Sequence, residues 1–207
     1  MGFRVTSSKK ATSDFCLTMK DIIERIILES SEIIKNSSKL TDKIEKAVNV
    51  ITDCIKNEHK IILFGNGGSA TDAQHIAAEF IGRYQLERKS FPAIALTTDS
   101  SILTSIANDY SYDLVFSRQC QSLVENGDVV IGISTSGNSK NVIEGLKTSK
   151  QKGAITIGLL GNNGGIIRDL VEIPIVVNSK STARVQEVHR IIYHIICELV
   201  EKNLSIS

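Results

Sequence analysis

The stretch that decides the fold is DVVIGISTSGNSKN, which runs from Asp128 to Asn141. It begins with an apolar run, residues 129–133, of the kind found in strands buried on both faces. Hydroxyl and amide side chains and one glycine follow, and a helical pattern begins near Asn141. A strand, a polar turn and a helix N-terminus bring backbone N–H groups and the positive end of a helix dipole to one point. The stretch therefore predicts an anion-binding turn, with an ordinary Ser/Thr helix cap as the alternative.

The chain contains a second turn of this kind, Gly65–Ser69, directly after another apolar run. Its paired glycines allow a ligand to approach the backbone closely, although a tight turn without a ligand is the alternative. Neither turn fits a nucleotide motif, because the P-loop pattern G-x-x-x-x-G-K-[ST] and the dinucleotide pattern G-x-G-x-x-G are both absent. The two turns therefore favour a small phosphorylated ligand over a nucleoside triphosphate.

Short apolar runs alternate with amphipathic segments from residue 60 onward. This alternation predicts an α/β fold with a doubly wound, mostly parallel five-stranded sheet and helices on both faces. Ligands in such folds bind beyond the carboxyl ends of the strands. We expect strands at 60–65, 93–97, 129–134, 154–160 and 172–177, and helices at 71–83, 101–106, 116–123, 141–152 and 166–170.

Helical patterns flank this unit on both sides. Residues 14–57 predict two helices with a break at Asn36–Ser38, and residues 183–203 predict one long C-terminal helix. The apolar stripe of that last helix is wider than one sheet face needs, so part of it is expected at a subunit interface. We divide the chain into a disordered leader, residues 1–13, and a single domain, residues 14–207.

Composition excludes several classes of protein. The net charge is +1 without a basic cluster, which argues against nucleic acid as the main partner. No run approaches the roughly 20 apolar residues of a membrane span. Four cysteines without a CxxC pair indicate reduced thiols and a cytoplasmic protein.

Two helical segments carry residues suited to acid–base or metal chemistry. His75 and Glu79 are four residues apart, so they share one helical face. In the last helix, Gln186 and His194 point about 80° apart, whereas His189 points about 140° away from His194. A solvated His–Glu pair and a packed core histidine are the alternatives.

These motifs, taken in order, resemble the phosphoheptose isomerases of the sugar-isomerase (SIS) domain family. The resemblance rests on Gly65–Ser69, the His75–Glu79 pair, Ala107–Tyr110, Ser134–Ser139 and the late Gln186 and His194. It implies a flavodoxin-like fold and a homotetramer with active sites at subunit interfaces. It also implies an aldose–ketose isomerase that converts sedoheptulose 7-phosphate to D-glycero-D-manno-heptose 7-phosphate through an enediol. That reaction is the first step of ADP- or GDP-heptose biosynthesis, which supplies lipopolysaccharide, capsule or another glycan.

The resemblance also implies roles for individual residues. Glu79 and His194 would transfer protons, and a zinc ion would bind His75, Glu79, Gln186 and His194. The residues implied in substrate binding are Asn66, Gly67, Gly68, Ser69, Glu79, Asn108, Asp109, Ser134, Thr135, Ser136, Ser139 and Gln186.

One local departure and two alternative functions accompany this interpretation. Ala183 stands where relatives often place a proline or an aspartate before the arginine. The alternatives are a non-catalytic SIS-domain regulator that binds the replication initiator protein, and an isomerase of another sugar phosphate.

Overall fold

The protein is described over residues 17–205 in a computed structural model, so the predicted leader lies outside the described residues. A parallel five-stranded sheet forms its centre, in the order β2-β1-β3-β4-β5. The predicted doubly wound α/β fold is therefore confirmed. The strands are β1 (Ile61–Gly65), β2 (Ala93–Ala95), β3 (Val129–Ser134), β4 (Ile155–Gly161) and β5 (Ile173–Val177).

The helices match the predicted segments closely, and the expected break between the first two is a short 3-10 turn, Ser37–Leu40. Among residues 17–205, no helix has both the length and the apolar character needed to cross a membrane. The α-helices are α1 (Met19–Asn36), α2 (Thr41–Lys56), α3 (Gly68–Ile81), α4 (Ser100–Asp109), α5 (Val115–Leu123), α6 (Lys140–Gln151), α7 (Ile167–Leu170) and α8 (Thr182–Ser205).

Alternating strand residues build two cores, one on each face of the sheet. Ile61 and Leu63 of β1 pack with α2, α3 and α8, whereas Ile62 and Phe64 pack with α5 and α6. Strand β3 is buried along its whole length, because helices cover both of its faces. The central strands are therefore held rigidly, and their carboxyl ends offer a fixed edge for a site.

Helix α8 buries one side of its apolar stripe and leaves the other side partly exposed. Ile192 and Ile196 are buried in the core, whereas Ile191 and Ile195 remain 37% and 38% exposed. These exposed residues line a groove of about 700 Å³ between α8 and the α1–α2 segment. The predicted surplus of apolar surface on this helix is present.

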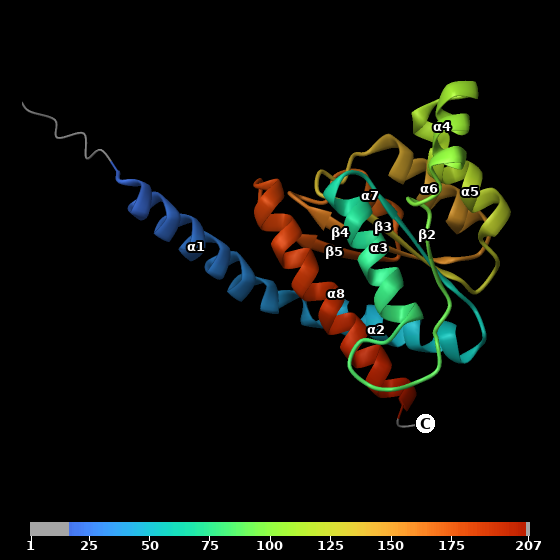
Figure 1. Ribbon diagram of the computed structural model, residues 1–207, viewed down its shortest axis with the longest axis horizontal. Helices are drawn as coiled ribbons and strands as arrows, with labels where there is room; N and C mark the ends of the chain where they lie inside the picture. Colours follow the sequence, from blue (N-terminus) through green and yellow to red (C-terminus); the bar gives the residue numbers. More distant parts are fainter. Residues whose placement is uncertain (1–16, 206–207) are drawn as a thin grey trace, which may run out of the picture.

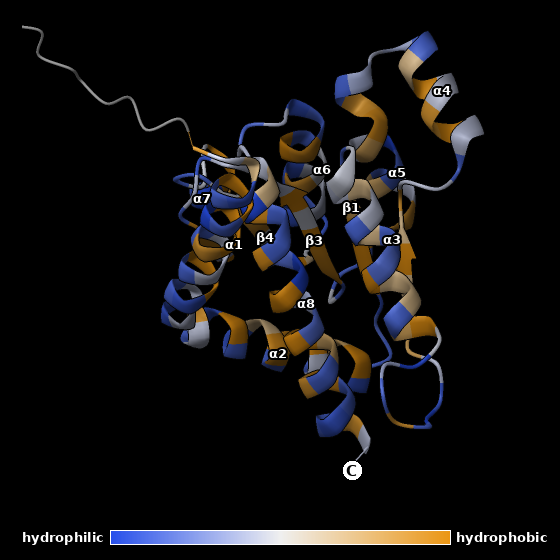
Figure 2. Ribbon diagram, turned by 60° about the vertical axis from the view of Figure 1, so that its left-hand side comes forward, coloured by the Kyte–Doolittle hydropathy of each residue, from blue (hydrophilic) through white to orange (hydrophobic). Residues whose placement is uncertain are grey.

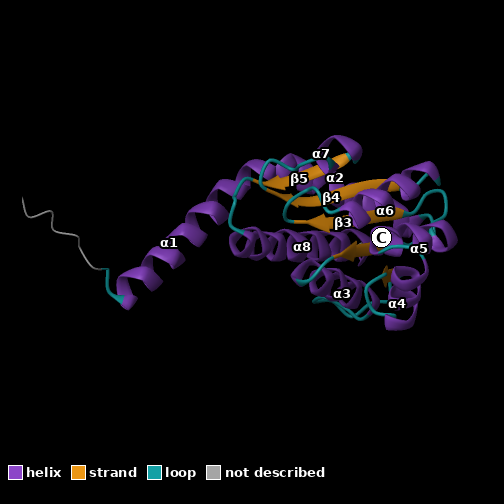
Figure 3. Ribbon diagram, turned by 90° about the horizontal axis from the view of Figure 1, so that it is seen from above, coloured by secondary structure: helices purple, strands orange, loops and turns teal. Residues whose placement is uncertain are grey.

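Helix α1 extends away from the rest of the molecule (Figures 1 and 3). It contributes no buried residue, and several of its apolar side chains face solvent. Arg184 at the start of α8 secures it, since its guanidinium donates to the Ile26 carbonyl (3.1 Å) and to Ser30 Oγ (2.6 Å).

Helix α3 begins at Gly68, three residues before the predicted start at Thr71. Gly67 occupies the cap position with φ +55°, a conformation that favours glycine. Ser69 then packs against Gly65 at the end of β1, with its side chain buried. Glycine and serine have lower helix propensities than alanine, so local propensity does not favour a helix start at Gly68.

Candidate active site

The serine-rich turn after β3 gathers three hydroxyl groups. Ser134 Oγ lies 3.0 Å from Ser139 Oγ and 3.4 Å from Ser136 Oγ. The backbone N–H of Gly137 donates to Ser134 Oγ (3.2 Å), and that of Asn138 donates to Ser136 Oγ (3.1 Å). Hydroxyls and main-chain N–H groups at a helix N-terminus form a suitable site for a phosphate.

The geometry of Ser139 distinguishes this turn from an ordinary helix cap. Ser139 occupies the cap position of α6, yet its side chain accepts no capping hydrogen bond from the helix backbone. Its hydroxyl contacts Ser134 instead. An ordinary cap would accept a hydrogen bond from the second or third residue of the helix. The anion-binding interpretation therefore fits this turn better than the capping one.

The loop after β4 packs against the serine turn and is hydrogen-bonded to it. Gly137 has φ +67°, and a Cβ at this position would collide with the carbonyl of Gly164. The N–H of Ile166 donates to Asn138 Oδ1 (3.0 Å), and the N–H of Ile167 donates to the Gly137 carbonyl (3.1 Å). Only glycine fits at position 137 without displacing the loop that contains Gly164.

The glycine turn lies beside the serine turn at the same edge of the sheet. Asn66 and Asn141 form a reciprocal amide pair, with both N···O distances at 2.9 Å. Tyr112 also donates its hydroxyl hydrogen to Asn66 Oδ1 (3.1 Å). Asn141 and Tyr112 were not singled out from the sequence, because only the tertiary fold brings them to Asn66.

Asn108 and Asp109 end helix α4, which stands apart from the body of the molecule (Figure 2). Both residues are exposed, and Asn108 Nδ2 donates to Asp109 Oδ1 (2.9 Å). Tyr112, three residues further on, connects this segment to the glycine turn. The segment that carries both residues is thus joined to the site edge.

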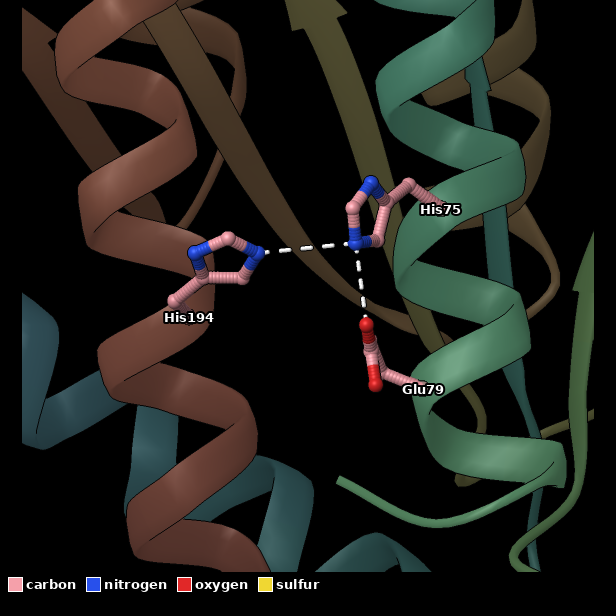
Figure 4. Close-up of side chains that lie close together, drawn as sticks. All are labelled: His75, Glu79 and His194. Carbon is pink, nitrogen blue, oxygen red and sulfur yellow. Dashed lines mark hydrogen bonds and ion pairs between the residues drawn. The ribbon is translucent and has the colours of Figure 1, made fainter. Parts of the chain in front are cut away.

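His75, Glu79 and His194 converge between α3 and α8 (Figure 4). His75 Nε2 lies 2.9 Å from Glu79 Oε1 and 3.5 Å from His194 Nε2. Burial and the neighbouring His75 lower the pKa of His194 below its ordinary value. A neutral imidazole at this position offers a lone pair for a metal or for a proton.

Aromatic rings enclose His194 on two sides. The ring of Tyr193 meets it edge-on at 4.7 Å between centroids, and the ring of Tyr84 lies at 5.7 Å. Tyr193 also reaches the buried carboxylate of Asp72, since its hydroxyl lies 3.4 Å from Asp72 Oδ1. The guanidinium of Arg190 lies at the same distance from that oxygen. The sequence suggested no role for Tyr84 or Tyr193, since ring packing between distant segments leaves no local pattern.

Gln186 lies beside Gly68, at the start of α3, and its amide fills the space that a side chain at position 68 would need. His194 follows two helical turns later, about 12 Å along the helix axis. Contacts between the two helices thus form a line of three pairs, Gly68 with Gln186, Asp72 with Arg190, and His75 with His194. We call this line the α3–α8 seam.

The donor set of the seam fits a metal ion. The ligand atoms of His75, Glu79 and His194 all lie within 4.8 Å of one another. Two imidazoles and one carboxylate are ligands that zinc prefers, and three protein ligands leave a position open for substrate. Gln186 belongs to the same seam, two turns away from this convergence.

The chain resembles known proteins over most of its length. A family model described as SIS domain matches residues 19–161. Phosphoheptose isomerase of Geobacter sulfurreducens is 51% identical over 180 residues, which cover 87% of this chain and 93% of that protein. The Aliarcobacter butzleri phosphoheptose isomerase is 49% identical over 184 residues, covering 89% and 97%.

Solved structures agree with the sequence comparison. The phosphoheptose isomerase GmhA from Neisseria gonorrhoeae superposes with a TM-score of 0.85 at 39% identity, covering 89% of this chain and 100% of that one. A phosphoheptose isomerase from Francisella tularensis gives 0.87 at 28% identity, covering 90% and 100%. The chain therefore belongs to the phosphoheptose isomerase family of SIS-domain proteins.

Proposed function

We propose that this protein converts sedoheptulose 7-phosphate to D-glycero-D-manno-heptose 7-phosphate. The observation that carries the proposal is the convergence of Glu79 with His75 and His194 in a phosphoheptose isomerase fold. An aldose–ketose isomerisation moves a proton between two neighbouring carbons, which requires a base and a proton carrier side by side. A carboxylate and an imidazole in this arrangement supply both.

The serine turn would hold the phosphate at the far end of the sugar. Ser134, Thr135, Ser136 and Ser139 would bind its oxygens, with help from Ser69. The gathered hydroxyls and the N-terminus of α6 support this assignment, since both favour an anion. Binding there would fix the position of the reacting carbons relative to the seam.

The remaining sugar contacts would come from polar groups at the edge of the sheet. Asn66, Gly67 and Gly68 would contact the hydroxyls of the sugar chain, together with Asn108 and Asp109. The exposed glycines leave the backbone of the first turn accessible to a ligand.

Glu79 would remove the proton from C1 of the ketose and so generate a cis-enediolate. His194 would transfer protons at the oxygens or return one to C2, which completes the aldose. Zinc held by His75, Glu79, Gln186 and His194 would supply Lewis-acid stabilisation of the negative charge on the enediolate oxygens. Without Gln186, the converging set of His75, Glu79 and His194 leaves a coordination position open for the substrate, which suits that role.

A direct assay tests the proposal. Purified protein is incubated with sedoheptulose 7-phosphate, and formation of the aldoheptose phosphate is followed with and without a chelator. We expect turnover that the chelator abolishes and added Zn²⁺ restores. Unphosphorylated sedoheptulose, fructose 6-phosphate and arabinose 5-phosphate serve as controls for the phosphate and the chain length. Faster turnover of a pentose or hexose phosphate would overturn the heptose assignment.

The active assembly would be a cytoplasmic homotetramer with sites at its subunit interfaces. The absence of any buried residue in α1 supports an assembly, as does the apolar groove between α8 and the α1–α2 segment. Sedimentation equilibrium checks the proposal, and a monomer at micromolar concentration would contradict it.

A further inference from the structure

Glu201 lies at the far end of α8 and is 1% exposed. Its carboxylate accepts hydrogen bonds from the backbone N–H groups of Tyr84 (2.9 Å), Gln85 (2.7 Å) and Leu86 (2.8 Å), and from Arg88 Nε (3.0 Å). Burial alone would raise the pKa of this carboxyl group, but the backbone donors and Arg88 outweigh it and hold the pKa below its ordinary value. A charged group buried with this many donors is fixed in one geometry.

Arg88 uses its remaining nitrogens at the C-terminal end of α3. Nη2 donates to the backbone carbonyl of Glu79 (2.8 Å), and Nη1 donates to that of Phe80 (2.9 Å). The last carbonyls of a helix have no partner within the helix, and a cation there also favours the helix dipole. The guanidinium also stacks over the ring of Phe91, 3.9 Å from its centroid. The residue that carries the proposed base is therefore tied down through its own backbone.

The position of Glu201 on α8 connects this contact to the site. Glu201 follows His194 by seven residues, which places the two on nearly the same helical face about 10 Å apart. The pair thus joins the end of the helix that carries Glu79 to the helix that carries His194. It also fixes the loop that brings Tyr84 against the His194 ring.

We propose that the Arg88–Glu201 pair is a positioning device that sets the separation of Glu79 from His194, and with it the geometry of proton transfer and metal binding. The inference rests on the proposed function. Neither residue touches the reacting atoms, so both are positioning residues. Glu79 and His194 lie on different helices, and no covalent path shorter than 115 residues joins them. Their relative position depends on contacts such as this one.

A second buried ion pair provides a matched control. Lys60 Nζ lies 2.9 Å from Asp128 Oδ2, and the Asp128 side chain is fully buried. Asp128 also accepts hydrogen bonds from the N–H groups of Lys60 (3.1 Å) and Glu125 (2.8 Å). This pair lies at the amino ends of β1 and β3, opposite the edge that carries the site. It therefore reports what losing a buried pair does to the fold alone.

The test compares E201Q and R88M with D128N. Each purified protein is stripped with chelator, titrated with Zn²⁺ by calorimetry, and assayed for isomerase kcat and KM after zinc is restored. Supporting contacts behind metal ligands are typically worth about 10- to 100-fold in metal affinity or activity. We expect E201Q and R88M to lose about tenfold or more in both zinc affinity and kcat, with KM nearly unchanged. D128N should lower Tm to a similar degree and change neither quantity.

R88K separates geometry from charge. Lysine keeps the positive charge but lacks the planar group that reaches Glu201 and the α3 carbonyls at once. We expect R88K to recover part of the Tm lost in R88M while zinc affinity and kcat stay low. Recovery of wild-type Tm, zinc affinity and kcat in R88K would overturn the positioning role. Wild-type zinc affinity and kcat in a folded E201Q protein would overturn it as well. If the wild-type protein does not isomerise the heptose phosphate, the proposed function fails, and the zinc titrations still decide the role of the pair.

Discussion

The serine turn and the α3–α8 seam are the two parts of the proposed site, and they are built in different ways. The hydroxyls of the serine turn come from six consecutive residues, Ser134–Ser139, and contact one another across two to five positions. The closest contact across the seam, between His75 and His194, joins residues 119 positions apart. The turn is therefore determined locally, whereas the seam exists only when two helices pack correctly.

This difference separates the two proposed tasks, phosphate binding by the turn and proton transfer at the seam. The turn is held in place by β3 and by the loop after β4, which contacts Gly137 and Asn138. Few distant substitutions should therefore disturb phosphate binding. The geometry of the seam depends on every contact between α3 and α8. Distant substitutions should therefore affect kcat and metal affinity more often than KM.

Replacing the proposed base should have the largest effect. E79Q keeps the size of the side chain and removes its basicity, so we expect kcat to fall about 10³-fold, within the range of general-base contributions. The serine turn remains intact, so KM should change little. E144Q, on the surface of α6, is the control with wild-type kinetics. Near-normal turnover by E79Q would refute the mechanism.

Breaking the serine turn through its backbone should have the next largest effect. Alanine at position 137 would have to adopt φ +67° and would collide with the Gly164 carbonyl. We expect G137A to raise KM about tenfold or more, since charged hydrogen bonds contribute about 1.5–3 kcal/mol each. Zinc affinity measured by calorimetry should stay at the wild-type value.

G153A is the matched control for this substitution. Gly153 also has a positive φ, +84°, but it follows α6 at the opposite end of the β3 and β4 strands. The left-handed conformation costs an alanine roughly 1–2 kcal/mol, so G153A should lower the free energy of unfolding. A comparable rise of KM in G153A would show that G137A acts through stability alone.

A milder change distinguishes binding from capping at Ser139. Removing a true serine cap costs about 1 kcal/mol of stability. Ser139 makes no capping hydrogen bond, and Ser134 keeps its contacts with Ser136 and Gly137 when the Ser139 hydroxyl is removed. S139A should therefore leave the free energy of unfolding within a few tenths of a kcal/mol of the wild-type value. KM should rise several-fold, since one phosphate donor is lost. A drop of about 1 kcal/mol in denaturant titrations with unchanged KM would restore the capping interpretation.

The smallest effect is expected at a buried contact between α8 and β4. His189 of α8 donates its Nε2 hydrogen to the carbonyl of Leu160 (3.0 Å), a residue that pairs with Ser134 across the sheet. Burial lowers the pKa of His189 below its ordinary value of 6.5. Below about pH 6.5 the imidazole binds a proton in the unfolded chain more readily than in the folded chain. The free energy of unfolding is therefore at its full value above about pH 6.5 and decreases as the pH falls.

H189Q tests this pH dependence. Glutamine keeps an N–H donor and cannot be protonated, so the free energy of unfolding of H189Q should fall less steeply between about pH 6.5 and 5. The lowered pKa of His194 leaves part of the slope in place. Urea titrations across this range provide the measurement. Equal slopes for H189Q and the wild type would contradict the assignment.

The sequence predicted the parts of this molecule that depend on local pattern. The strand at Val129–Ser134, the break near Asn36 and the turn that follows β3 each arise from neighbouring residues. Apolar periodicity and turn chemistry act over a few positions, so one sequence is enough to reveal them. The early start of α3 was missed, because burial of Ser69 overrides the poor helix propensity of glycine.

The seam was harder to predict from the residues themselves. The spacing of His75 and Glu79 predicted a shared face, which Figure 4 confirms, but it did not predict the approach of His194. Resemblance to a family supplied that connection. Neither route indicated Arg88 and Glu201, since a charged residue in a loop and another at a helix end usually remain on the surface.

The exposed apolar face of α1 makes protein concentration an experimental variable. Met19, Ile23, Ile27 and Leu28 are each more than half exposed in a single chain. Removing one such side chain from water is worth about 1.5–3 kcal/mol when complete, and about 1.4 kcal/mol changes an equilibrium tenfold. Covering two of them would thus shift association by roughly a hundredfold or more. Dilute kinetic assays and concentrated calorimetry can then contain different oligomers. A substitution on α1 that weakens association would then resemble a catalytic defect unless both measurements use the same protein concentration.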